Sequence, residues 1–320
     1  MSYVQTVTGR ISPDELGVCD FHEHTLLTWA EMLGQPRPRF DHVEAFERIR
    51  SLLDDFRDAG GEALVDAGMT WFGPEPWLLL ALAYGTGINI IASVGFFNEM
   101  DCPMPALVYA SSIDELVGWL TSAITDGIDG TGVKPGVLKA ASSSDRITPI
   151  EERAIRAVGR AQRQTGAGVI THVSGPAVES RLGLRQVELF AEEGADLSKI
   201  VIGHMGWDET PDPLAYHVEV ARTGVNLGYD QIGHALHEDE FWVGLITEMV
   251  GQGFVGQLFL SHDSVGAWVG PNQVEGQKLN HTYSHVLRSI VPKLRAAGVE
   301  ERDIETMLVE NPKRLLTMPS

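Results

Sequence analysis

Residues 18–24 read Val-Cys-Asp-Phe-His-Glu-His, a short apolar run that ends in two histidines two positions apart. Side chains two positions apart on a β-strand point to the same side, so His22 and His24 can reach one point in space. An isolated His-X-His pair is weak evidence of a site. Here the pair ends the first strand that the sequence predicts, and the ends of later predicted strands carry similar residues.

Short apolar or β-branched runs alternate with amphipathic stretches along the whole chain. We predict strands at residues 18–24, 62–68, 88–95, 134–142, 168–174, 199–206, 224–230 and 257–263. We predict helices near residues 42–59, 74–84, 112–127, 149–164, 178–193, 212–222, 239–252 and 281–297. Strict alternation of strands and helices is typical of a parallel sheet covered by helices.

Eight strand–helix units are the number that closes a (β/α)8 TIM barrel. An open, doubly wound sheet is the alternative, and it would place a glycine-rich phosphate loop after the first strand. This chain has His22-Glu23-His24 there instead. We therefore predict an α/β fold in which residues 1–320 form a single (β/α)8-barrel domain. The C-terminal ends of its strands would form the active-site face.

Helix signals agree with this alternation. Ser112 with Glu115 makes a capping-box pattern, and Thr148-Pro149 with Glu151 makes another, with proline at the first helical position. The stretch 265–280 is the longest predicted loop. In a barrel it would follow the eighth strand, on the catalytic face.

Composition and charge restrict the classes of partner. The chain has 44 acidic and 24 basic residues, for a formal net charge of −20, and such a surface repels phosphate backbones and anionic lipids. We therefore expect neither a nucleic-acid nor a membrane partner. Cys19 and Cys102 make no disulfide framework, and the N-terminus lacks the apolar run of a signal peptide. Both observations favour a reducing, cytoplasmic location.

Three more predicted strands end in residues that bind metal ions. The fifth ends in Val-Ile-Thr-His172, the sixth in Val-Ile-Gly-His204 and the eighth in Phe-Leu-Ser-His262-Asp263. Since these ends would meet at one face of a barrel, the side chains converge with those of the first strand. Imidazole and carboxylate ligands suit zinc, our first expectation, and also manganese, cobalt or iron.

The fourth predicted strand contributes a lysine, in Gly-Val-Leu-Lys139. A buried, protonated lysine beside metal cations is electrostatically unfavourable. Two explanations stay open from the residues alone. Lys139 can be a neutral base or Schiff-base former, or it can carry CO2 as a carbamate and bridge two metal ions as an anion.

Taken together, these motifs resemble the phosphotriesterase family of the amidohydrolase superfamily, which includes the phosphotriesterase-like lactonases. The resemblance runs from end to end of the chain and implies an amidohydrolase-type barrel and a homodimer. It is carried by Glu15-Leu-Gly, His22-Glu-His24, Gly-Val-Leu-Lys139, Val-Ile-Thr-His172, Ile-Gly-His204, Gly-Tyr-Asp230, Ser-His-Asp263 and Glu310-Asn-Pro-Lys-Arg-Leu315.

The resemblance implies a role for each matching ligand. His22, His24 and Asp263 would bind the more buried of two divalent metal ions. His172 and His204 would bind the more exposed ion. Carboxylated Lys139 and a hydroxide would bridge the two ions, and Asp263 would accept the proton from that hydroxide.

Two further acidic residues match positions that support the ligands. Asp230 follows the seventh strand and would hold the ligand geometry from behind. Asp208, in Met-Gly-Trp207-Asp208, either does the same or caps the next helix.

The chain departs from the family pattern at two places. Gln231 follows Asp230, where the family's hydrolases often carry histidine or arginine, and an amide cannot relay a proton. Gly95-Phe96-Phe97 lacks the tyrosine that the phosphotriesterase-like lactonases usually place near the end of strand three. These departures weaken the transfer of the organophosphate enzymes' proton relay and of the lactonases' carbonyl contact.

Large apolar residues dominate the predicted loops on the catalytic face. With Gln231, they are the candidate lining of a substrate pocket: Trp29, Trp71, Phe72, Phe96, Phe97, Trp207, Tyr229 and Trp268. Apolar walls with few polar groups favour a neutral, partly apolar small molecule. His281 and Glu23 receive no role, and His262 is predicted to be a core histidine because it alternates with Asp263 along the strand.

Three functions compete. The first is hydrolysis of a lactone or another carboxylic ester by a hydroxide that bridges two metal ions. The second is hydrolysis of an organophosphate triester or an N-acyl amide at the same metal site, because both reactions place charge on an oxygen that a metal can hold. The third is a non-catalytic small-molecule-binding protein, which the complete ligand set disfavours.

Overall fold

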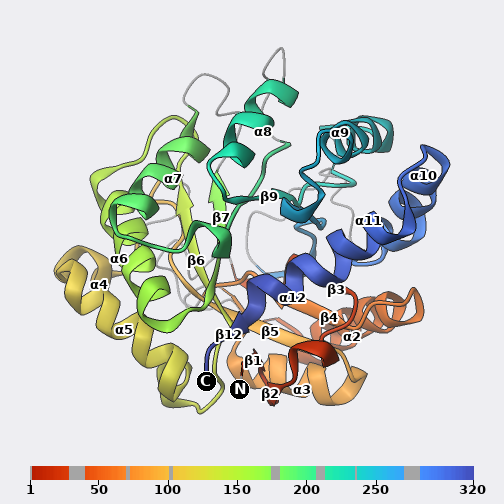
Figure 1. Cartoon of the computed structure of the whole chain (residues 1–320). Coiled ribbons are helices and arrows are strands. Elements are labelled where there is room, and N and C mark those ends of the chain that lie inside the picture. Colours follow the sequence, from red (N-terminus) through yellow and green to blue (C-terminus); the bar gives the residue numbers. More distant parts are fainter. Residues whose placement is uncertain are drawn as a thin grey trace.

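The computed structural model describes residues 2–28, 40–69, 73–100, 104–173, 181–206, 213–234, 236–269 and 282–320. Parallel strands curl into a barrel in the order β10-β9-β8-β7-β6-β5-β4-β3-β11, and helices surround it (Figure 1). The predicted (β/α)8 TIM barrel is confirmed. Among the described residues, none of the helices has the length and apolar character needed to cross a membrane.

The strands fall into the barrel and a small antiparallel sheet beside the termini. The barrel strands are β3 (Cys19–Thr28), β4 (Ala63–Asp66), β5 (Asn89–Gly95), β6 (Val137–Ser142), β7 (Gly168–Val173), β8 (Ile200–Ile202), β9 (Asn226–Tyr229), β10 (Leu258–Leu260) and β11 (Val265–Val269). The small sheet has the order β12-β1-β2 and contains β1 (Tyr3–Thr6), β2 (Gly9–Ile11) and β12 (Thr317–Met318).

Helices follow the barrel strands on the outside. They are α2 (His42–Asp58), α3 (Pro76–Thr86), α4 (Ala106–Ala110), α5 (Ile113–Asp126), α6 (Pro149–Thr165), α7 (Leu182–Glu192), α8 (Pro213–Arg222), α9 (Asp239–Gly251), α10 (Val291–Ala296), α11 (Glu301–Glu305) and α12 (Asn311–Leu316). Two π-helical turns, η5 (Val286–Ile290) and η6 (Thr306–Glu310), precede α10 and α12. The capping boxes predicted from Ser112 with Glu115 and from Thr148 with Glu151 start α5 and α6.

Two elements differ from the sequence prediction. The first residues of the expected loop 265–280 form β11, which pairs in parallel with β3 from His24 to Thr28, while 270–280 lie outside the described residues. The expected helix 281–297 begins as the π-helical turn η5 and continues as α10. In both cases a long-range contact decides the local structure: a ladder with β3 for β11, and a hydrogen bond to His262 at the start of η5.

Side-chain and main-chain hydrogen bonds join β3 to the segment that follows β10. The amide of Asp263 donates to the carbonyl of His22 at 3.1 Å, and the amide of His22 donates to Ser261 Oγ at 3.0 Å. These bonds close the barrel between the first and the last strand of the predicted set. They also fix the spacing between two of the expected metal ligands.

Glycine is required where β5 leaves the barrel. Gly95 has φ +156°, and a side chain there would collide with the backbone carbonyl of Lys139 on β6. The amide of the next residue, Phe96, donates to that carbonyl at 3.1 Å. This close approach sets where the loop after β5 begins.

A buried polar network lies behind the closure of the barrel. His262 Nδ1 lies 2.7 Å from Glu23 Oε1 and 3.0 Å from Asp20 Oδ2, and the amide of Val286 donates to His262 Nε2 at 2.8 Å. Because Nε2 accepts this bond, the ring proton sits on Nδ1, between the two carboxylates. Burial, together with Asp20, raises the pKa of Glu23 well above its ordinary value.

The network makes a prediction for stability. His262→Ala leaves two buried carboxylates and the amide of Val286 without their partner, so we expect the free energy of unfolding to fall by about 3 kcal/mol or more. The matched control is His285→Ala, which removes a partly exposed imidazole 2.8 Å from Asp239 and should cost about 1 kcal/mol or less. Urea denaturation of the metal-free proteins measures both, and equal losses would contradict the assignment.

Candidate metal centre

The six predicted ligands lie together at the C-terminal mouth of the barrel. His22 and His24 lie on β3, Lys139 lies on β6 and His172 on β7. His204 and Asp263 lie within three residues of the ends of β8 and β10. Four of the six are buried: His22, His24, Lys139 and His204.

The donor atoms of one half of the cluster face each other around Asp263. His24 Nε2 lies 3.0 Å from Asp263 Oδ1, and His22 Nε2 lies 3.6 Å from the same oxygen. Lys139 Nζ lies 2.8 Å from His22 Nε2. These are the residues expected to hold the more buried ion and its bridge.

The other half of the cluster uses the second oxygen of the same carboxylate. His204 Nε2 lies 3.6 Å from Asp263 Oδ2 and 2.5 Å from His172 Nδ1. The structure therefore places all six side chains in one continuous group, with Asp263 between the halves.

Two of the expected ligands adopt a strained backbone. His204 has φ 58° and Asp263 has φ 51°, in the left-handed region that non-glycine residues rarely occupy. Both residues lie in the segment that follows a barrel strand. Such strain is retained where the surrounding structure fixes it, and here it directs the two side chains to the cluster.

Asp230, at the end of β9, orients two of the imidazoles at once. Its Oδ1 lies 2.8 Å from His204 Nδ1 and accepts from the His204 amide at 2.8 Å, and its Oδ2 lies 2.8 Å from His22 Nδ1. Although burial opposes ionisation, His204 and His22 hold the pKa of Asp230 well below its ordinary value. With Nδ1 of each ring turned to this carboxylate, Nε2 of each is left to face the cluster.

Burial lowers the pKa of several donors of the cluster. It lowers the pKa of His22 to about 4, with Lys139 adding to the effect. It lowers the pKa of Lys139 to about 8, against the pull of Asp263 and Asp230, and also lowers that of His172. Although burial opposes the charged form, Asp230 raises the pKa of His204. Imidazoles, a lysine amine and a carboxylate that face one another are a donor set that suits divalent metal ions once the amine and the imidazoles lose their protons.

Gln231 holds the shared carboxylate from the side. Its Nε2 donates to Asp263 Oδ2 at 2.7 Å and lies 3.2 Å from His204 Nδ1. A side-chain amide can fix the orientation of Asp263 but cannot carry a proton away from it.

The predicted pocket residues separate into three groups. Phe97 and Trp268 pack against an apolar cluster at the mouth made by Leu27, Met69 and Val265. Outside the described residues lie Trp29, Trp71, Phe72, Trp207, Asp208 and His281.

The third group, Phe96 and Tyr229, was predicted to line the substrate pocket, and the structure places both rings elsewhere. Phe96 is buried against Trp119 of α5, with ring centroids 5.7 Å apart. Tyr229 is buried against Trp242 of α9, and its hydroxyl lies 3.0 Å from His217 Nδ1. Because side chains alternate along a strand and its extension, these two rings face the helices rather than the barrel mouth.

Sequence reasoning missed two residues beside the site. Asp66 ends β4 and accepts bonds from the amide and hydroxyl of Thr25 and from the amide of Gly68, which ties β4 to the ligand-bearing β3. His234, after β9, donates from Nε2 to the carbonyl of His262 at 2.6 Å. Asp66 carried a usable signal, because it lies close to the C-terminal end of the predicted strand 62–68.

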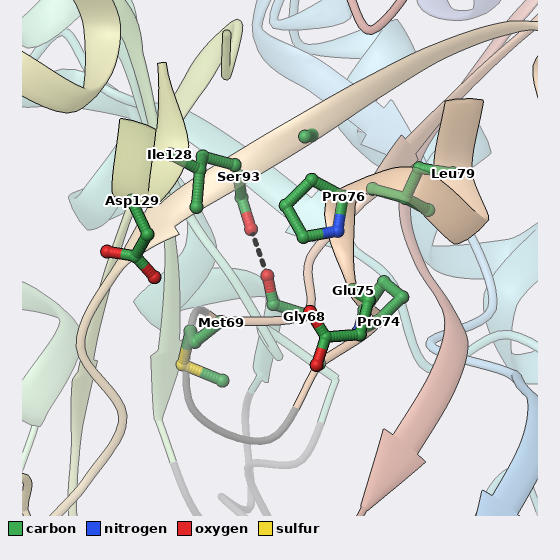
Figure 2. A pocket seen from close by; sticks show the side chains of 11 residues that line it. Gly68, Met69, Pro74, Glu75, Pro76, Leu79, Ser93, Ile128 and Asp129 are labelled. Atoms are coloured by element: carbon green, nitrogen blue, oxygen red, sulfur yellow. Dashed lines mark hydrogen bonds between the residues drawn. The ribbon is translucent and has the colours of Figure 1, made fainter. Parts of the chain in front are cut away.

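A small pocket beside the ends of β4 and β5 is not the substrate site. It has a volume of about 50 Å³, and its lining includes Gly68, Met69 and Ser93, whose hydroxyl donates to the carbonyl of Gly68 at 2.7 Å (Figure 2). This volume holds a water molecule or two, far less than a substrate pocket requires. The six ligands are not part of its lining.

Comparison with known sequences agrees with this geometry. The model of the phosphotriesterase family matches residues 2–316. The phosphotriesterase homology protein of Mycobacterium tuberculosis is 30% identical, and the match covers 98% of each chain. The N-acetyltaurine hydrolase of Mus musculus is also 30% identical, with 98% of this chain and 97% of the relative covered.

Solved structures show the same similarity over the whole chain. An organophosphate hydrolase engineered from a weak promiscuous lactonase template superposes with a TM-score of 0.89 at 33% identity, covering 98% of this chain and 99% of that one. A mutant of a phosphotriesterase-like lactonase from Deinococcus radiodurans superposes with a TM-score of 0.86 at 32% identity and equal coverage. The chain therefore belongs to the phosphotriesterase family and is a hydrolase.

Proposed function

We propose that this enzyme hydrolyses a lactone or another carboxylic ester at a centre of two divalent metal ions. The observation that carries the proposal is that six candidate ligand side chains form one group around Asp263, beside the apolar cluster of Leu27, Met69 and Val265. The same proposal includes a single domain over residues 1–320, a homodimer and a cytoplasmic location, as the family resemblance and the composition suggest.

The residues divide between the two ions as their contacts suggest. His22, His24 and Asp263 would hold one ion, and His172 and His204 the other, with Lys139 as a carbamate between them. Zinc is our first choice, with manganese, cobalt and iron as alternatives. When bound, the ions would lower the pKa of a water molecule and polarise the oxygen of the scissile bond.

The chain's own residues would manage the proton of that water. Asp263 faces both halves of the cluster, so its carboxylate is placed to accept the proton. Gln231 holds the same carboxylate at 2.7 Å but cannot pass the proton onward. We therefore propose that the proton leaves Asp263 through water or the leaving group and not along a chain of side chains.

The apolar cluster at the barrel mouth favours a neutral, partly apolar substrate. Phe97 and Trp268 pack against Leu27, Met69 and Val265 at the mouth of the barrel. A neutral substrate with an apolar group gains binding free energy when that group is buried there. A phosphorylated sugar would instead need positively charged side chains to bind its phosphate.

Hydrolysis of an organophosphate triester or an N-acyl amide is the second candidate. It is favoured by the relatives, since one is an N-acetyltaurine hydrolase and one similar structure was engineered for organophosphate hydrolysis. The same ligand set would serve these reactions, because each develops charge on an oxygen that a metal ion can hold.

A substrate panel tests the proposal. We expect the metal-loaded enzyme to act faster on lactones and aryl esters than on paraoxon-type triesters or N-acetyltaurine. Lys139→Ala should lower kcat/KM by about 100-fold or more, because it removes a ligand. Lys134→Ala changes a half-buried lysine before the same strand and should stay within about twofold. Ester hydrolysis no faster in wild type than in Lys139→Ala would overturn the proposal.

The role of Gln231 gives a separate prediction. Gln231→Leu removes the donor that holds Asp263, so we expect metal affinity to fall about 10- to 100-fold. Gln162→Leu is the matched control, since Gln162 is a buried amide on α6 whose Oε1 accepts from the Asp196 amide at 2.9 Å. Competition with a chromogenic chelator measures both. Identical affinities in the two variants would show that Gln231 does not hold the ligand.

A further inference from the structure

The loop after β5 carries Phe97 to the metal centre and is fixed at its start by the barrel. Gly95 packs against the carbonyl of Lys139, and the amide of Phe96 donates to that carbonyl at 3.1 Å. Phe97 follows at once, and its ring centroid lies 4.7 Å from that of His172. One aromatic side chain of this loop therefore touches an expected metal ligand.

The far end of the loop is fixed by Glu151, at the start of α6. This carboxylate is fully buried. Its Oε1 accepts from the amide of Glu99 at 2.7 Å and from the hydroxyl of Ser143 at 2.5 Å, and that hydroxyl accepts from the amide of Met100 at 3.3 Å. Its Oε2 accepts from the amide of Thr148 at 2.9 Å, which is the capping-box bond of α6.

A second carboxylate strengthens the same attachment. Glu99 accepts from the hydroxyl of Thr148 at 2.6 Å and from the hydroxyl of Tyr109 at 2.8 Å. Between the two attachments lie only Phe97 and Asn98, and Asn98 is fully buried. The backbone of Phe97 is thus held by hydrogen bonds on both sides of a very short segment.

Capping of α6 does not by itself explain why the carboxylate of Glu151 is buried. Glu115 forms the corresponding capping box of α5, where Glu115 Oε2 accepts from the Ser112 amide at 2.7 Å, and it does so from an exposed position. Glu151 does the same for α6 and in addition binds groups after β5 and β6, the strands that lead to Phe97 and Lys139. A buried carboxylate is costly unless it is fully hydrogen-bonded, and here the additional donors come from the catalytic face.

We propose that Glu151 is a positioning residue that holds Phe97 against His172 and thereby sets which substrates fit beside the metal centre. The proposal rests on the proposed hydrolase site for its effect on substrate choice. Glu151 itself lies behind the loop and is assigned no contact with substrate. Its loss should free the Phe97 segment while leaving the six ligands in place.

Hydrogen exchange of the metal-loaded enzyme tests the attachment without any substrate. In Glu151→Ala we expect the amides of Glu99 and Met100 to exchange at least about tenfold faster, because both lose protection. Glu115→Ala removes a helix cap alone and should leave that segment unchanged. Unaltered exchange at Glu99 in Glu151→Ala would overturn the proposal.

Two more conservative variants separate the hydrogen bonds that hold the Phe97 segment from the capping bond of α6. They also keep the proposal testable if Glu151→Ala does not fold. In Glu151→Gln, the amide oxygen can still accept from the Glu99 amide and the Ser143 hydroxyl, while the NH2 group loses the Thr148 bond. We therefore expect exchange at Glu99 and Met100 to be as slow as in the wild type. Ser143→Ala keeps the cap but removes the hydroxyl between Glu151 and Met100, so exchange at Met100 should rise. Fast exchange in Glu151→Gln together with slow exchange in Ser143→Ala would assign Glu151 to the cap alone and refute the proposal.

Kinetics tests the effect on substrate choice. For a small and a bulky substrate of one class, we expect Glu151→Ala to change the ratio of their kcat/KM values at least about tenfold, mainly through KM, with unchanged metal content. An equal loss for both substrates would mean a general structural effect and would contradict the proposal. If the wild type hydrolyses no ester, the proposed function fails, and the same ratio is measured with the triesters or amides that it does hydrolyse.

Discussion

Two imidazole rings share one buried carboxylate, that of Asp230, and the geometry of the candidate metal centre depends on this sharing. The oxygens of Asp230 lie 2.8 Å from Nδ1 of His22 and of His204. This arrangement turns Nε2 of both rings to the same space, where Lys139, His172 and Asp263 lie. A carboxylate behind each imidazole also makes it a stronger ligand.

The barrel fold offsets the free-energy cost of this arrangement. Burying carboxylates, a lysine and several imidazoles in one place is unfavourable unless each is paired. The parallel strands bring their C-terminal ends to one mouth, so residues far apart in sequence pair at short range. The network of Asp20, Glu23 and His262 then joins β3 to the end of β10, which keeps the two sides of the ligand cluster at a fixed separation.

The barrel and the meeting of the six candidate ligands at its mouth could be predicted from sequence because both depend on local patterns. Several predicted strands ended in or near a residue that can bind a metal ion, such as His172 or His204, and a barrel brings such ends together whatever the loops do. The directions of Phe96 and Tyr229 could not be predicted, because they depend on which side of the strand faces the helices at that residue. Nor could the role of Glu151, because its partners Glu99 and Ser143 meet it only in the folded chain.

The central claim is a centre of two metal ions bridged by carboxylated Lys139. It is tested most directly by measuring the metal content per chain and, under non-acidic native conditions, the mass gain at Lys139. We predict two divalent ions per chain and a mass gain of about 44 Da, one CO2, on Lys139. One ion or none, with unmodified lysine after supply of bicarbonate and divalent metal, would contradict the account.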